Sequence, residues 1–212
     1  MKELKIKTPK TARVYLSGEI TGKTEEIVFA IHGYAQLGKY FIKKFDSIAS
    51  EKCVVVVPEA LNKFYWNGMN GKVVASWMTK EDRLSEIEDY IEYLNTVFEL
   101  VTKQASENVK ITALGFSQGT ATICRWILDK NYTKISRLIL WAGAMPKDVF
   151  FEAKKFKHFD LIFVLGKQDE YISEIDLKNH ISEIQKEGIN PKTILFDGNH
   201  NICLEKTPPL FA

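Results

Sequence analysis

The sequence predicts an α/β protein whose mostly parallel central sheet is covered by helices on both faces. Short apolar runs rich in β-branched residues alternate along the chain with longer segments of helical period. Several of these runs, such as residues 54–57, are apolar without alternation, which is typical of strands buried on both faces. No repeat, linker or low-complexity tract interrupts the 212 residues, so we expect one domain spanning 1–212.

The individual strands follow from the apolar runs. They are expected at residues 12–16, 27–32, 53–58, 109–116, 137–142, 160–165 and 193–196. Ligands of such sheets bind beyond the carboxyl ends of the strands, so that edge is where chemistry is expected.

The clearest helix is expected over residues 81–104, where apolar residues recur every three or four positions. The stripe consists of Leu84, Ile87, Ile91, Leu94, Phe98 and Val101. Thr79 and Asp82 are expected to form a capping box at its start.

Another helix should begin near Ser173, with Asp176 three residues on, and end at Gly188. Further helices are expected at 37–49, 118–129 and 147–156.

Charge and cysteine usage exclude several classes of function. The 29 Lys and Arg residues nearly balance 27 Asp and Glu residues along the same segments, which argues against nucleic acid as a partner. Three cysteines without a CxxC pair predict a reduced cytoplasmic protein. A chain of 212 residues can bury enough surface to fold without a disulfide or a metal. No signal-peptide pattern and no apolar stretch of about 20 residues is present, so no membrane span is expected.

The strongest chemical motif is Gly115-Phe-Ser117-Gln-Gly119, which lies between an expected strand and an expected helix. G-x-S-x-G places a serine on a sharp turn from strand to helix, and its glycines let the two elements approach closely. The turn lifts Oγ of Ser117 above the sheet, so Ser117 is the expected nucleophile of an α/β-hydrolase fold.

A serine nucleophile needs a base, and in this fold the base comes last in the order Ser, acid, His. Of the three histidines after Ser117, His200 directly follows the last expected strand. His180 falls inside a helix, and His158 precedes a strand at the opposite end of the sheet. His200 is therefore the expected base.

The acid that orients the base should follow the preceding strand, 160–165. Asp169 is the leading candidate, Glu170 the second and Asp197 the third. Each could instead be a solvated loop carboxylate.

Two backbone N–H groups are expected to form an oxyanion hole. One belongs to Gln118, the residue after the nucleophile, and the other to Tyr34, in the loop after strand 27–32. Gly33 makes that turn possible. His32 precedes the nucleophile and is expected to order the loop rather than to act as a base.

Four pieces of the chain resemble the phospholipase/carboxylesterase family of small α/β-hydrolases, which includes acyl-protein thioesterases. They are Ile31-His-Gly-Tyr, Leu114-Gly-Phe-Ser-Gln-Gly, Gly166-Lys-Gln-Asp-Glu-Tyr-Ile and Gly198-Asn-His. The resemblance implies an esterase or thioesterase that acts through an acyl-enzyme, with no cofactor and a minimal lid. It assigns the triad to Ser117, Asp169 and His200. His-Gly-Tyr-Ala-Gln and Gly-Asn-His depart from the more glycine-rich loops of that family, which leaves the substrate open.

Residues 59–78 are rich in aromatic residues without a regular period and follow a strand's carboxyl end. Members of this segment could line an acyl pocket or simply pack the loop onto the domain. The candidates are Phe64, Tyr65, Trp66, Met69 and Trp77. Trp126 and Trp141 fall within core elements and are expected to pack there.

Ester or thioester hydrolysis on a small-molecule or acyl ester substrate is the expected function. The alternatives are peptidase or acyltransferase chemistry on the same triad, and a binding protein on a hydrolase fold without turnover. The oligomeric state and the role of the apolar end of the chain, residues 207–212, are left open.

Overall fold

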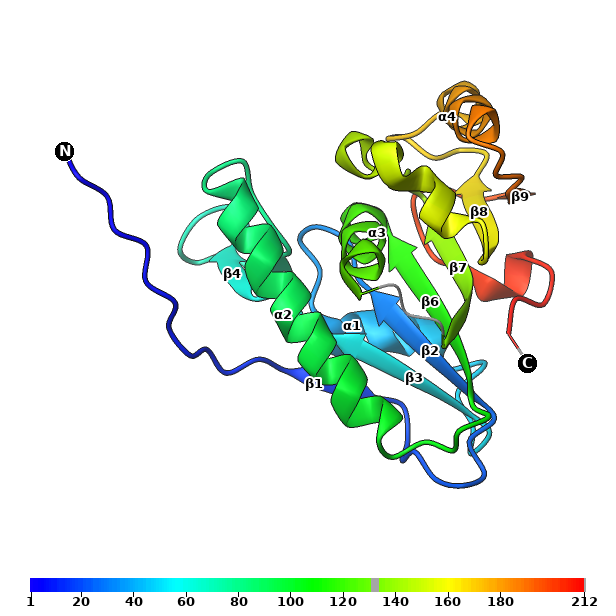
Figure 1. Cartoon of the computed structure of the whole chain (residues 1–212), viewed down its shortest axis with the longest axis horizontal. Coiled ribbons are helices and arrows are strands. Elements are labelled where there is room, and N and C mark those ends of the chain that lie inside the picture. Colours follow the sequence, from blue (N-terminus) through cyan, green and yellow to red (C-terminus); the bar gives the residue numbers. More distant parts are fainter. Residues whose placement is uncertain (131–133, 212) are drawn as a thin grey trace.

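A computed structural model describes residues 1–130 and 134–211 of the chain. Its main sheet has seven strands in the order β1-β3-β2-β6-β7-β8-β9, and all neighbouring pairs except β1 with β3 are parallel (Figure 1). The strands are β1 (Val14–Leu16), β2 (Glu26–Ile31), β3 (Cys53–Pro58), β6 (Lys110–Phe116), β7 (Ile135–Trp141), β8 (Asp160–Gly166) and β9 (Lys192–Phe196). The mostly parallel sheet and all seven expected strands are confirmed, with ends that differ by at most two residues.

Two further strands form a separate antiparallel hairpin, β4 (Asn62–Tyr65) with β5 (Val73–Ser76). They lie in the aromatic segment for which the sequence shows no period. The helices are α1 (Gly38–Phe41), α2 (Arg83–Thr102), α3 (Gln118–Lys130) and α4 (Glu174–Lys186), and the 3₁₀ helices are η1 (Ile42–Phe45), η2 (Lys147–Phe156) and η3 (Leu204–Lys206).

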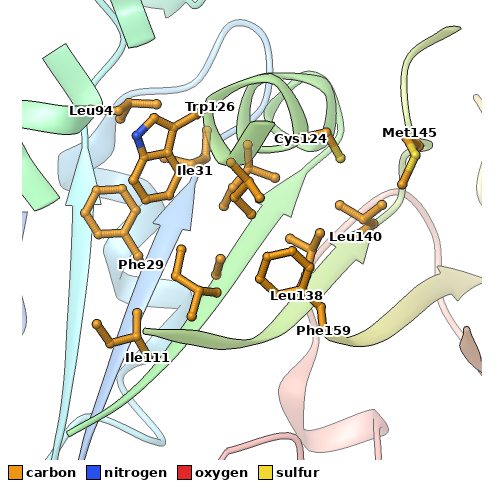
Figure 2. Close-up of a cluster of buried hydrophobic side chains, with 14 of the residues drawn as sticks. Phe29, Ile31, Leu94, Ile111, Cys124, Trp126, Leu138, Leu140, Met145 and Phe159 are labelled. Carbon is orange, nitrogen blue, oxygen red and sulfur yellow. The ribbon is translucent and has the colours of Figure 1, made fainter. Parts of the chain in front are cut away.

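The two faces of the sheet carry different cores because successive side chains of each strand point to opposite faces. On β2, Phe29 belongs to a cluster covered by α2, α3, η2 and α4, while Val28 belongs to a second cluster under α1 and η1. Figure 2 shows the first cluster, in which Trp126 of α3 stacks on Phe29 with ring centroids 4.9 Å apart. Trp126 and Trp141 are fully buried, as expected.

Several expected helix details are wrong. Asp82 precedes α2 with a left-handed backbone (φ 46°) and caps no N–H; its carboxylate contacts Lys5 and Ser85 instead. The amide of Thr79 is bonded to the Glu86 carboxylate, so the capping box at Thr79 and Asp82 does not form.

The apolar stripe of α2 also begins later than expected, because Leu84 is 68% exposed while Leu94, Phe98 and Val101 are buried. The capping box at Ser173 and Asp176 is confirmed, and Gly188 follows that helix with φ 75°.

The helix expected at 37–49 is shorter and divides into α1 and η1, ending at Phe45. The chain must then turn into β3, and reciprocal bonds between Ser50 and Cys53 hold that turn. The helix expected at 147–156 has the expected bounds but is 3₁₀, with a kink at Glu152.

The apolar end of the chain docks on the domain. Leu210 is buried in the second cluster, and its carbonyl accepts a bond from Arg137 Nη1 at 2.5 Å. No helix among the described residues is both long enough and apolar enough to cross a bilayer.

Candidate active site

The predicted site residues all follow the carboxyl ends of parallel strands, so the topology brings them to one edge of the sheet. Ser117 follows β6, Asp169 follows β8, His200 follows β9 and Tyr34 follows β2. Strands β2, β6, β7, β8 and β9 are consecutive in the sheet.

Ser117 occupies a sharp turn between β6 and α3, with φ 53° in the left-handed region that a non-glycine residue rarely adopts. Its amide donates to Trp141 O at 2.9 Å on the neighbouring strand. Thr120 Oγ1 donates to the Ser117 carbonyl at 2.7 Å. Hydrogen bonds to both the amide and the carbonyl of Ser117 therefore hold its strained backbone conformation.

Glycines around Ser117 allow the close approaches that the turn requires. A Cβ on Gly119 would lie 2.3 Å from Ile31 O, and one on Gly115 would lie 2.5 Å from Gly119 O. A Cβ on Gly33 would lie 3.1 Å from Cβ of Ser117, so the loop after β2 passes directly beside Ser117.

The imidazole of His200 is paired with Asp169. Its Nδ1 lies 2.8 Å from Oδ2 of Asp169, whose side chain is fully buried. The other carboxylate oxygen accepts the amides of Tyr171 and Ile172 at 2.9 and 3.0 Å. Each oxygen of this carboxylate therefore has a partner, and one of them faces the ring.

The other candidate acids do not contact the imidazole. Glu170 accepts the backbone amide of His200 at 3.3 Å, and Asp197 has a side chain that is 81% exposed and pairs with Lys167. Among the three acids predicted from the sequence, the structure brings Asp169 to the ring.

Aromatic rings enclose His200. The ring of Phe116, the residue before Ser117, has its centroid 5.0 Å from the imidazole, and that of Tyr171 lies 4.7 Å from it edge-on. The following loop is anchored by Trp141 Nε1, which donates to Asn201 O at 3.0 Å. The sequence gives no signal for the packing of Tyr171, because that depends on how two separate loops meet.

The other three histidines lie where the sequence places them, and none of them is the expected base. His180 is on α4 and its Nε2 accepts the Met145 amide, while His158 is exposed just before β8. His32 is fully buried, with Nε2 accepting the Ala60 amide at 3.0 Å and Nδ1 2.8 Å from Gly33 O. These contacts agree with the expectation that His32 orders its loop. Burial lowers the pKa of His32 to about 4, so the ring is neutral.

Of the two predicted oxyanion donors, Tyr34 lies in the loop after β2 and Gln118 at the start of α3. The amides on either side of Tyr34 are bonded within the protein, Gly33 to Gln36 Oε1 at 2.8 Å and Ala35 to Ala75 O at 2.9 Å. Gln118 begins α3, where the first N–H groups of a helix have no acceptor within that helix.

The candidate lining residues of segment 59–78 lie in different surroundings. Tyr34, Phe64 and Trp66 form an aromatic cluster with ring centroids 5.5 to 6.3 Å apart, and Trp66 is 44% exposed. Trp77 is 1% exposed and donates from Nε1 to His32 O, so of the two expected roles it has that of packing within the core. Met69 is 86% exposed at the hairpin turn.

Two concavities of about 290 and 200 Å³ lie away from this edge. The first is bordered by the amino ends of β2, β6 and β7, and the second by η3 and the C-terminal segment. Neither is bordered by Ser117, Asp169 or His200. Among residues 1–130 and 134–211, no three His, Cys, Asp or Glu side chains are grouped so that they could hold a metal ion.

A mostly parallel α/β sheet, a serine on a strained turn after β6 and a histidine–carboxylate pair at the same edge of the sheet are the features of an α/β-hydrolase of the serine hydrolase class. The family model described as serine hydrolase (FSH1) matches residues 23–207, and the chain belongs to this family. No curated protein sequence matches the chain.

Solved structures with the same fold include those of the family that the sequence resembles. Zea mays acyl-protein thioesterase 2 has a TM-score of 0.70 at 14% identity, covering 92% of this chain and 94% of that one. Esterase PE8 has a TM-score of 0.65 at 17% identity with the same coverage. A phospholipase/carboxylesterase from Dyadobacter fermentans has a TM-score of 0.61 at 14% identity, covering 92% of each chain.

Proposed function

We propose that this serine hydrolase cleaves carboxylic esters or thioesters through an acyl-enzyme, with Ser117, His200 and Asp169 as its triad. The observation that carries the proposal is the pairing of His200 Nδ1 with a buried carboxylate, at the same edge of the sheet as a serine on a strained turn. The names of the structural neighbours, thioesterase and esterase, support the substrate class.

The geometry suits a two-step reaction. Oγ of Ser117 attacks the carbonyl carbon while Nε2 of His200 takes its proton, and the Tyr34 and Gln118 amides bind the developing oxyanion. His200 then protonates the leaving alcohol or thiol. Water, deprotonated by the same ring, attacks the acyl-enzyme, and the acid is released with Ser117 regenerated.

Asp169 keeps the reactive nitrogen of His200 directed at the serine. Because Nδ1 is paired with the carboxylate, Nε2 remains to exchange the proton, and the buried charge stabilises the imidazolium that forms.

The aromatic cluster of Tyr34, Phe64 and Trp66 is the proposed apolar surface for the acyl group. It includes Tyr34, whose amide is a proposed oxyanion donor, and part of Trp66 is open to solvent.

The test compares the parent with Ser117→Ala on p-nitrophenyl esters and acyl thioesters of increasing chain length. We expect hydrolysis by the parent, loss of at least about 10³-fold in kcat for Ser117→Ala, and fluorophosphonate labelling of the parent alone. Ser182→Ala on the exposed face of α4 is the matched control and should retain parental activity. A parent that neither hydrolyses these compounds nor takes the label would instead be a binding protein.

A further inference from the structure

The side chain of Gln118 bonds to the end of the β4–β5 hairpin. Its Oε1 accepts the Trp77 amide at 3.1 Å, and its Nε2 donates to Met78 O at 3.0 Å and to Ser76 Oγ at 3.2 Å. The opposite amide orientation would place NH₂ against the Trp77 N–H and Oε1 against a carbonyl, so these partners fix which atom is which. The residue after the nucleophile is thus tied to residues about 40 positions earlier.

The loop that carries Tyr34 is bonded to the same strand end. The Ala35 amide donates to Ala75 O at 2.9 Å, and the Ala75 amide donates to Gln36 O at 3.1 Å. One segment, residues 75–78, therefore contacts both the loop of Tyr34 and the start of α3, which carry the proposed oxyanion donors.

Segment 75–78 is itself rigidly seated. Ala75, Ser76 and Trp77 are buried, and Trp77 Nε1 donates to His32 O at 2.9 Å. Ser76 Oγ also donates to Met78 O at 2.8 Å, which closes the turn that Gln118 caps.

We propose that the Gln118 side chain is a positioning residue that sets the separation of the Tyr34 and Gln118 amides by locking the nucleophile turn onto segment 75–78. The inference rests on the proposed function, because it assigns both amides to the oxyanion hole. Donors accelerate acyl transfer when they are held where the charge develops, and a misplacement of about 1 Å can cost on the order of 100-fold in rate. Gln118 is thus required for its side chain as well as for its amide.

The test uses Gln118→Met, which retains the length of the side chain but loses all three bonds. With a p-nitrophenyl ester we expect kcat to fall about 10- to 100-fold while KM stays within about twofold, because the contacts act on the transition state. A boronic acid, whose tetrahedral adduct with Ser117 places an oxygen in the oxyanion hole, should bind more weakly by the same factor as kcat/KM falls. Gln104→Met, at an exposed glutamine beyond α2, is the matched control and should leave all three quantities unchanged.

A second variant separates positioning from folding. Gln118→Glu retains an acceptor for the Trp77 amide but sets a carboxylate against Met78 O, so it should fold and still weaken boronate binding. Thermal unfolding of each variant is measured alongside. The inference is overturned if folded variants keep kcat within about twofold of the parent, or if kcat falls while boronate affinity is unchanged. If Ser117→Ala also retained activity, the proposed function would fail, whereas an inactive Ser117→Ala beside a parent-like Gln118→Met would overturn this inference alone.

Discussion

Nδ1 of His200 lies 2.8 Å from Oδ2 of Asp169, and the carboxylate that makes this contact has no exposed surface. Along the chain, Asp169 precedes α4 and His200 follows it, and α4 connects the two strands after which they lie, β8 and β9. The same carboxylate accepts two amides of its own loop, so its position does not depend on the imidazole.

Asp169→Asn should therefore leave the loop in place but lower kcat by roughly 10³- to 10⁴-fold, because an amide can impose the wrong tautomer on His200. Steady-state kinetics on an ester substrate measures the loss. Glu170→Gln and Asp197→Asn are the matched controls, since neither carboxylate contacts the ring, and each should remain within about threefold of the parent. A loss at Asp197 that equals the loss at Asp169 would contradict the assignment.

The two tryptophans of the hairpin region should respond differently to truncation. Trp66→Ala removes part of the exposed aromatic cluster and should raise KM for long-chain esters by about tenfold, equivalent to about 1.4 kcal/mol, with little change in stability. Trp77→Ala empties a buried site and should lower the free energy of unfolding by about 3–5 kcal/mol. Urea unfolding and a KM series over chain length separate the two effects. An unchanged KM for every ester in Trp66→Ala would remove the aromatic cluster from the substrate site.

Gly119→Ala should destabilise the fold by about 3 kcal/mol or more, because its Cβ would lie 2.3 Å from Ile31 O and 2.7 Å from His32 O, both backbone atoms. Denaturant unfolding measures the change. Gly18→Ala is the matched control, since nothing lies within 4 Å of the Cβ it would add, and it should change stability by less than about 1 kcal/mol. Equal stability of the two variants would show that β2 and α3 are not as close as described.

Stability should fall below neutral pH because of His32. Burial lowers the pKa of its ring from 6.5 to about 4 in the folded protein. Above pH 6.5 the ring is neutral in both states. Between pH 6.5 and 4 only the unfolded chain binds the proton, so the free energy of unfolding decreases as pH falls, by at most roughly 3 kcal/mol.

Substituting His32 by Gln, which can still accept the Ala60 amide, should flatten this part of the pH dependence. The measurement is urea unfolding at intervals from pH 7 to pH 4. His158→Gln, at an exposed histidine, should retain the parental slope. If the slope is the same in the parent and in His32→Gln, the buried ring does not cause it.

Most of the sheet could be predicted because its strands are long, apolar and buried on both faces. β2, β3, β6 and β8 each give a continuous run, and their parallel order places Ser117, Asp169 and His200 at one edge. The β4–β5 hairpin could not be predicted, since its four-residue strands are partly exposed and Lys63 and Tyr65 face solvent.

Local sequence signals gave wrong or incomplete expectations where a tertiary contact decided the position of a side chain. Asp82 is of a residue type that often caps helices, but its carboxylate contacts Lys5, 77 residues away. Trp77 is of a residue type that often lines apolar pockets, but its indole N–H donates to the His32 carbonyl and the side chain is buried. The side-chain bonds of Gln118 likewise join segments that the sequence does not show to be neighbours.

Both members of the Asp169–His200 pair belong to the unit β8–α4–β9, which closes one margin of the sheet and meets the rest of it along β7. β9, the outermost strand, is largely exposed. Ser117 instead follows β6, which lies in the middle of the sheet between β2 and β7. A local opening of this outer unit would separate the Asp169–His200 pair from Ser117 while the central strands stay paired. On heating, activity should therefore be lost at a lower temperature than the midpoint of global unfolding.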